Sequence, residues 1–135
     1  MAKIARPEIE IEELTGEGSG ILKKNALLYG KELGEHCRMY TEVVMPEGSD
    51  LAFHVHEGES ETYYILTGTG IYNDNGTKYP VKAGDVVFCG DGEGHGLLNN
   101  GKEDFKFIAL ILEKNKMTGT LHNIFILCYN LNILL

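Results

Sequence analysis

Basic residues are scarce in this chain and nowhere gather into a cluster. Twelve Lys and Arg stand against 20 Asp and Glu, which gives a formal net charge of −8, and the longest basic run is Lys23-Lys24. A nucleic-acid-binding surface needs a basic patch, so we expect no nucleic-acid partner. The acidic surface favours solubility but names no substrate.

Cysteines and long apolar runs are also few. The three cysteines are Cys37, Cys89 and Cys128, and no two share a close spacing such as CxxC. An odd number without close pairs argues against a disulfide framework and indicates a reducing compartment. The sequence shows no apolar signal-peptide core near its start and no apolar run of the roughly 18 residues that a membrane helix needs. We therefore expect a cytoplasmic protein with no membrane partner.

What the chain does have is many short strand patterns separated by glycine-rich turns. It contains 17 Gly in 135 residues, a length that favours one domain spanning residues 1–135. Turn signals recurring every ~8–12 residues predict an all-β sandwich or barrel. We place N-terminal strands within 8–29, and strict alternation from Glu8 to Glu12 predicts a half-exposed strand with Ile9 and Ile11 facing inward.

The core of the domain is expected at about 36–112, followed by an apolar tail at 113–135. The segment from His122 to Leu135 contains no Asp, Glu, Lys or Arg. An exposed segment of this kind would invite edge pairing and aggregation, so it is covered by its own barrel or by a second subunit, or else is disordered. The tail and the edges of an open sandwich together predict a homodimer.

The stretch from Gly48 to Gly68 organises the chain. It contains His54-Val55-His56 within an apolar segment that predicts a strand. Side chains at positions i and i+2 of a strand point to the same face, so the two imidazoles should project together. Glu61 follows a short polar turn and begins a second predicted strand. Two imidazoles and a carboxylate that converge across a turn are typical of a metal site with mixed nitrogen and oxygen ligands.

A second stretch, from Gly84 to Asn99, supplies a further imidazole. A short buried strand is followed by the turn Gly90-Asp-Gly-Glu-Gly94, and His95 then opens another predicted strand. The segment ends at Asn99, which shares strand parity with His95.

These two stretches resemble the two motifs of the cupin family, and the similarity extends loosely over about 39–112. The matching positions of the first motif are Gly48, His54, His56, Glu61 and Gly68; those of the second are Gly84, Gly92, His95 and Asn99. One position departs from the pattern, because Gly90 stands where the second motif usually has Pro. We expect this change to loosen the turn before His95 without removing a ligand.

The resemblance to small single-domain cupins implies a double-stranded β-helix, or jelly-roll barrel, which turn spacing alone does not select. It also implies that His54, His56, Glu61 and His95 hold one divalent transition metal per chain, either Mn, Fe, Ni or Zn. Four protein ligands leave up to two positions on an octahedral metal for water, dioxygen or a bidentate small molecule.

Two further residues are candidates for the substrate pocket. Tyr63 shares strand parity with Glu61, so its hydroxyl could meet a bound ligand; the alternative is a core aromatic with a satisfied hydroxyl. Asn99 is the second candidate, and its alternative role is closing a turn. Cys89 is expected to be a small buried hydrophobic residue without a redox role.

Two functional classes remain open from the sequence. The first is a metal-dependent enzyme acting on a small carboxylate or similar chelating molecule, of the decarboxylase or dioxygenase type. The alternative is a non-catalytic metal-containing binding or sensor cupin. Sensor cupins are often fused to a DNA-binding domain, and since none is recognisable here, the enzyme is favoured. No catalytic acid or base is assigned.

Overall fold

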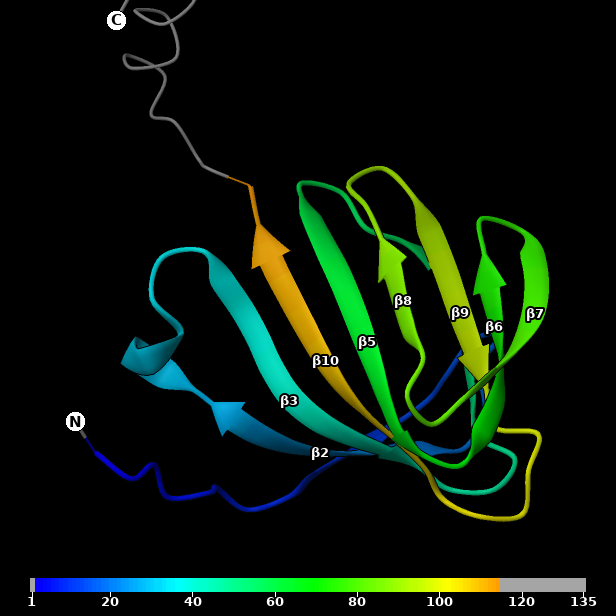
Figure 1. Ribbon diagram of the computed structural model, residues 1–135, viewed down its shortest axis with the longest axis horizontal. Coiled ribbons are helices and arrows are strands. Elements are labelled where there is room, and N and C mark those ends of the chain that lie inside the picture. The colour runs from blue at the N-terminus through cyan, green and yellow to red at the C-terminus, as the bar shows by residue number, and fades with distance from the viewer. Residues whose placement is uncertain (1, 115–135) are drawn as a thin grey trace, which may run out of the picture.

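The protein is described by a computed structural model that places residues 2–114. This part of the chain folds into ten β-strands and one short 3₁₀ turn, η1 (Figure 1). The strands are β1 (Glu10–Glu13), β2 (Ile21–Leu28), β3 (Cys37–Met45), β4 (Asp50–Val55), β5 (Glu59–Thr67), β6 (Thr69–Asp74), β7 (Thr77–Lys82), β8 (Val86–Cys89), β9 (Gly94–Leu98) and β10 (Phe105–Glu113); η1 is Gly30–Leu33. The all-β prediction is confirmed.

The strands form two antiparallel sheets. The larger sheet has the order β1-β2-β3-β10-β5-β8, and the smaller sheet has the order β4-β9-β6-β7. Strands that follow one another in sequence therefore often belong to different sheets, as β4 and β5 do (Figure 1). This alternation brings the chemistry-bearing residues of β4, β5 and β9 to the same interior.

The core lies between the two sheets and follows the period-2 pattern of the strands. In β10, Phe105, Phe107, Ala109 and Ile111 are buried. Alternate side chains of a strand face opposite sides of its sheet, so one face of β10 fills the barrel. Tyr72 and Leu97, on the smaller sheet, supply buried side chains to the same core.

The prediction that the isoleucines of the first strand face inward is wrong. Ile9 and Ile11 are 59% and 53% exposed, and every residue of β1 is exposed. Among the described strands, β1 lies at the edge of its sheet and pairs with β2 alone. Alternation identifies a strand with two chemically different faces, but it does not reveal whether another layer extends far enough to cover one of them.

Two β-bulges interrupt the regular pairing near the predicted metal ligands. In β4, Leu51 pairs with Leu97 and His54 pairs with His95, so three steps along β4 match two along β9. A bulge changes which residues face the interior. Here Leu51 lines the internal cavity, while the bulge before His54 turns that imidazole to the same side.

The second bulge lies in β3. Met39 pairs with Ile111 and Cys37 pairs with Leu112, which leaves Arg38 as the extra residue. Cys37 and Cys89 are free thiols. Cys89 is 1% exposed, and burial raises the pKa of its thiol to about 11, in keeping with the predicted buried, unreactive role.

Part of the predicted apolar tail, residues 115–135 with Cys128, lies outside the described residues. Within residues 2–114, the structure contains no helix of the length and apolarity needed to cross a membrane.

Candidate metal centre

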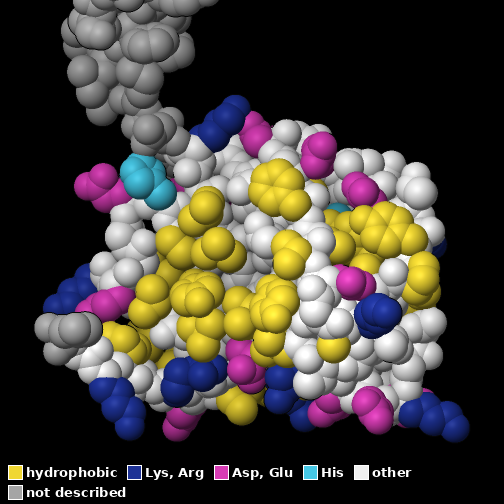
Figure 2. Space-filling model, in the orientation of Figure 1, with side chains coloured by type: hydrophobic (Ala, Val, Ile, Leu, Met, Phe, Trp, Pro, Cys, Tyr) yellow, Lys and Arg dark blue, Asp and Glu magenta, His cyan; other side chains and the backbone are white. Residues whose placement is uncertain are grey.

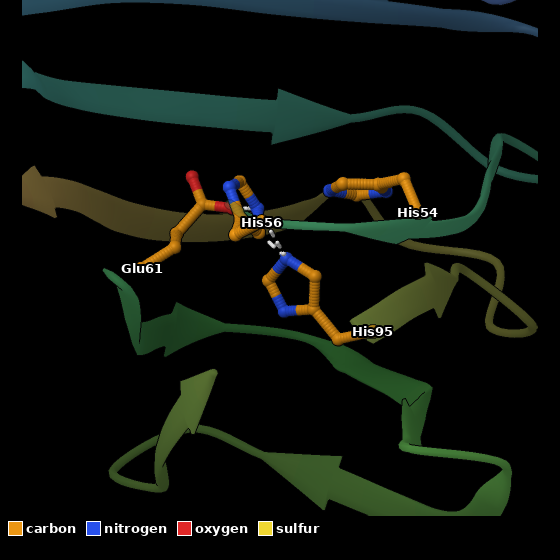
Figure 3. A group of neighbouring side chains, drawn as sticks. All are labelled: His54, His56, Glu61 and His95. Atoms are coloured by element: carbon orange, nitrogen blue, oxygen red, sulfur yellow. Dashed lines mark hydrogen bonds and ion pairs between the residues drawn. The ribbon is translucent and has the colours of Figure 1, made fainter. Parts of the chain in front are cut away.

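Four side chains from three neighbouring segments converge inside the barrel (Figure 3). His54 lies on β4 and His56 directly after it, Glu61 lies on β5, and His95 lies on β9. One ligand atom from each residue can be chosen so that all four atoms lie within 4.8 Å of one another. The structure thus brings together the four residues expected to bind metal, in a group able to hold an ion.

The spacing of three of these ligand atoms fits a metal ion. His56 Nε2 lies 3.0 Å from His95 Nε2 and 3.1 Å from Glu61 Oε1, and the last two atoms are 3.0 Å apart. Ligands held at right angles, about 2.1 Å from a common centre, are separated by about 3.0 Å. Three imidazoles and one carboxylate suit Mn, Fe, Ni or Zn.

The second ring nitrogen of each imidazole is also held. Nδ1 of His54 lies 2.9 Å from the carbonyl oxygen of Ala52, and Nδ1 of His95 lies 2.9 Å from the Tyr72 hydroxyl. Nδ1 of His56 has a carboxylate partner, Glu59, which is treated below. Contacts at Nδ1 fix the ring orientation, so the Nε2 atoms are directed toward the common centre.

The candidate ligands differ in burial, and for His54 burial favours the uncharged form that an imidazole ligand needs. His56, Glu61 and His95 are all buried, at 6%, 4% and 1% exposure, while His54 is half-buried. Burial lowers the pKa of His54 below its usual value, against a smaller opposing effect of its bond to the Ala52 carbonyl. A neutral imidazole keeps a lone pair available to a cation.

Tyr63 is in contact with two members of the metal centre. Its hydroxyl donates a hydrogen bond to Glu61 Oε1 at 3.0 Å, and its ring stacks on His95 with centroids 5.0 Å apart. Burial, followed by the charge of Glu61, raises the pKa of Tyr63 well above its usual value, so the hydroxyl stays protonated. Tyr63 is therefore a core aromatic with a satisfied hydroxyl that also lines the internal cavity.

Asn99 lies away from that cavity and closes a loop. Its amide nitrogen donates to the carbonyl oxygens of Met45 and Glu103, and its side-chain oxygen accepts from the backbone N–H of Gly101. With 1% exposure, its side chain uses both amide N–H groups and its oxygen to tie the loop between β9 and β10 to the end of β3.

The turn before His95 is held by hydrogen bonds, one of which needs a backbone N–H that the usual Pro lacks. The backbone N–H of Gly90 donates to Glu93 Oε2 at 2.7 Å, and the N–H of Glu93 donates to the Gly90 carbonyl. The same turn bonds to the backbone of His56 on both sides, through Gly92 N–H and the Glu93 carbonyl. The expected loosening is therefore offset, and the turn also positions His56.

A cavity of about 460 Å³ opens beside the metal centre. His54, His56, Glu61 and Tyr63 line it together with an apolar wall from β3 and β10. Charged groups also line it: Lys24, Arg38, Glu12 and Glu13. Sequence reasoning missed these four. Strand alternation in β2 could have identified Lys24 as facing inward, because it lies two residues after the buried Leu22. Arg38, in contrast, reaches the cavity through a bulge that no sequence pattern indicates.

Comparison with known proteins agrees with this geometry. The family model of the cupin domain matches residues 41–111, which include all four candidate ligands. The chain belongs to the cupin family. The jelly-roll prediction is confirmed with it, since solved cupins share the arrangement of the two sheets.

Two relatives of this cupin come from Thermotoga maritima. An oxalate-binding protein is 41% identical over 95 residues, which cover 70% of this chain and 78% of the relative. A crystal structure of a protein described as a predicted oxalate decarboxylase is 38% identical, with a TM-score of 0.74, over 78% of this chain and 91% of that one. The cupin domain of Cnp3 from Schizosaccharomyces pombe, at 22% identity and a TM-score of 0.62 over 76% of this chain and 68% of that one, shares the fold.

Proposed function

We propose that this cupin binds one divalent transition metal through His54, His56, Glu61 and His95 and uses it to hold oxalate or a similar small chelating carboxylate. The observation that carries the proposal is the convergence of these four side chains beside a cavity large enough for a small molecule, which three of them line. A metal held by four protein ligands retains coordination positions for a bidentate guest.

The affinity for an anionic guest must arise inside the cavity, because the overall charge of the protein does not favour it. A net charge of −8 opposes the approach of anions, so affinity for a carboxylate must arise locally. Lys24 and Arg38 line the cavity but are paired with carboxylates, so the metal must supply the positive charge that attracts the guest. Tyr63 lies in the same wall, and we propose that its ring bounds the guest.

The relatives support the choice of guest. One is an oxalate-binding protein and another is described as a predicted oxalate decarboxylase, and both align with most of this chain. Oxalate carries two adjacent carboxylates that can chelate a single cation. The ion itself is Mn, Fe, Ni or Zn, because all four accept imidazole and carboxylate ligands.

Isothermal calorimetry of the metal-loaded and metal-free protein with oxalate is the direct test. We expect oxalate to bind the loaded form only. Acetate, which has a single carboxylate, and succinate, whose carboxylates are farther apart, should bind at least ten times more weakly because neither forms the same compact chelate. Equal oxalate binding to both forms would show that the metal does not hold the guest.

A second candidate function is turnover of the bound carboxylate. Decarboxylation of hydrogen oxalate breaks the C–C bond, releases CO₂ and adds the proton to the carbon of the remaining formate. Glu12 and Glu13 bring carboxyl groups to the cavity, where a proton donor is needed. Formate formed without net consumption of dioxygen would favour decarboxylation, CO₂ formed without formate and with consumption of dioxygen would favour oxidation of oxalate, and no product would leave a binding protein.

We also propose that the cupin is a cytoplasmic homodimer. Large apolar side chains gather on the outer face of the larger sheet (Figure 2). Tyr64, Val86, Phe88 and Leu112 are 46%, 63%, 59% and 44% exposed. At typical side-chain areas these four expose about 400 Å², around half of what one partner buries in a standard interface. A second copy with the same apolar face would cover this surface.

A further inference from the structure

His56 differs from the other two imidazoles because its second nitrogen has a charged partner. Nδ1 of His56 lies 2.8 Å from Glu59 Oε1. An ionised carboxylate can only accept a hydrogen bond, so the proton of this contact lies on Nδ1. In the neutral ring that a metal ligand requires, the lone pair of His56 is then on Nε2, the atom that faces Glu61 and His95.

Glu59 is in turn held by Arg38. The guanidinium Nε donates to Glu59 Oε2 at 2.7 Å, and Nη2 donates to Oε1 at 2.8 Å. Paired parallel hydrogen bonds of this kind fix the plane of a carboxylate as well as its position. The Glu59 side chain is 16% exposed and that of Arg38 is 47% exposed, so the carboxylate is largely covered while the guanidinium remains partly in solvent.

The bulge in β3 is what allows Arg38 to make this contact. Met39, the next residue, lines the cavity, and in a regular strand its neighbour would point to the opposite face of the sheet. Arg38 is the residue left over between the Met39–Ile111 and Cys37–Leu112 pairs. Bulges next to functional sites redirect side chains in this way, and Arg38 thereby joins the cavity wall.

We propose that Arg38 and Glu59 are positioning residues that fix the tautomer and the ring orientation of His56 and so strengthen metal binding. Arg38 acts through Glu59: it orients the carboxylate, and the carboxylate holds Nδ1–H. The inference rests on the metal-binding part of the proposed function and does not depend on which carboxylate is bound. The device belongs to this chain's own residues, since Glu59 lies between the two motif positions His56 and Glu61.

A purely structural role for the same contact is the competing explanation. Arg38 on β3 reaches Glu59 on β5 across the end of β10, so the ion pair also ties the sheet together. A structural tie would affect the free energy of unfolding but not the state of the His56 ring in the folded protein. The test must therefore measure the protonation and orientation of the His56 ring as well as the metal affinity.

The first measurement is zinc affinity, by titration of the metal-free protein against a competing chelating dye. Glu59→Gln keeps the shape of the side chain but removes its charge, and we expect zinc affinity to fall roughly 10- to 100-fold. Arg38→Met should produce a smaller loss in the same direction, and Arg38→Lys should recover part of it. The double variant should be no weaker than Glu59→Gln alone, because Arg38 acts through Glu59.

Lys24→Met is the matched control. Lys24 also lines the cavity and pairs with carboxylates, Glu10 and Glu12, but neither partner contacts a metal ligand. The zinc affinity of Lys24→Met should remain within twofold of that of the unmodified protein. An equal loss in Lys24→Met and Arg38→Met would overturn the proposal, because any cavity cation would then have the same effect.

The second measurement is the ¹H–¹⁵N spectrum of the histidine rings in the zinc-loaded protein. The Nδ1–H resonance of His56 should move upfield in Glu59→Gln and stay in place in Lys24→Met, because an amide oxygen is a weaker acceptor than a carboxylate. If Glu59→Gln changed neither the His56 resonance nor the zinc affinity, the proposed positioning role of Arg38 and Glu59 would be refuted. Failure of oxalate to bind would contradict the proposed function alone, since neither of these measurements involves oxalate.

Discussion

The Tyr63 hydroxyl donates a 3.0 Å hydrogen bond to the same oxygen of Glu61 that lies nearest to the imidazoles of the metal centre. A buried hydroxyl that binds a ligand carboxylate restricts where that carboxylate can turn. The Glu61 side chain is thereby held in place before any ion is bound.

Tyr63→Phe should therefore affect both stability and metal binding. The change removes one hydrogen bond to a charged acceptor and leaves the ring packing in place, so we expect the metal-free protein to lose about 1.5–3 kcal/mol of unfolding free energy. Zinc affinity should fall severalfold because Glu61 gains rotational freedom. Urea denaturation and zinc titration of the same preparation would check both, and unchanged zinc affinity would mean that Glu61 is held by its other contacts.

His56→Ala should abolish stoichiometric metal binding. It removes one ligand and leaves Glu59 without its imidazole partner, so zinc affinity should drop by more than about 100-fold. His36→Ala is the matched control, because His36 is exposed and lies outside both motifs. Elemental analysis of the purified proteins would show close to one metal per chain in the control. Full metal content in His56→Ala would contradict the assignment of this ligand.

Asn99→Ala should destabilise the fold without changing ligand binding. The substitution leaves the Met45 and Glu103 carbonyls and the Gly101 N–H without a buried partner, so the unfolding free energy should fall by about 3 kcal/mol. Zinc and oxalate affinities, measured below the melting transition, should match the unmodified protein. A selective loss of oxalate affinity in the folded variant would instead place Asn99 in the substrate pocket.

Gly96→Ala should disturb the bulge that orients His54. A Cβ at Gly96 would lie 3.0 Å from the Leu51 carbonyl oxygen and 3.1 Å from Phe53 N, both backbone atoms of the bulge. We expect a loss of about 1–3 kcal/mol in unfolding free energy, together with weaker zinc binding. Gly101→Ala, which would meet the Thr69 side chain far from the ligands, should leave zinc affinity unchanged. If both variants bind zinc normally, the bulge does not depend on Gly96.

Phe88→Glu should convert the proposed dimer to a monomer. It places a negative charge at a side chain that is 59% exposed on the outer face of the larger sheet. Ile11→Glu is the control, since Ile11 is similarly exposed but lies on the edge strand β1. Light scattering should give a halved mass for Phe88→Glu only. A monomeric unmodified protein would contradict the dimer itself.

The fold and the grouping of the four candidate ligands could be predicted because both are encoded locally. The His54 and His56 spacing and the turn before Glu61 lie within one short stretch, and the resemblance of two such stretches to known motifs indicated the fold. The features that could not be predicted, the bulges and the position of Arg38, depend on pairing between strands. The bulges in β3 and β4 depend on how each strand aligns with a partner about 40 to 75 residues away. No pattern within β3 marks Arg38 as the residue that leaves the regular alternation.

The exposure of the first strand likewise could not be predicted from the pattern of its own residues. Alternation around Ile11 resembles the alternation in β10, yet β10 lies in the middle of the larger sheet and β1 at its edge. The sequence of a strand specifies which residues share a face. The presence of a second layer over that face depends on the whole topology.

The candidate metal ligands come from both layers of the barrel, with His54 and His95 on strands of the smaller sheet and Glu61 on a strand of the larger one. An ion bound there is a cross-link that closes one end of the sandwich, and the sheets cannot separate at that end while it is held. A ligand present at a thousand times its dissociation constant adds about 4 kcal/mol to the stability of the state that binds it. In hydrogen exchange, loading with metal should accordingly slow β4, β9 and β5 as one cooperative unit, and chelation should release all three together.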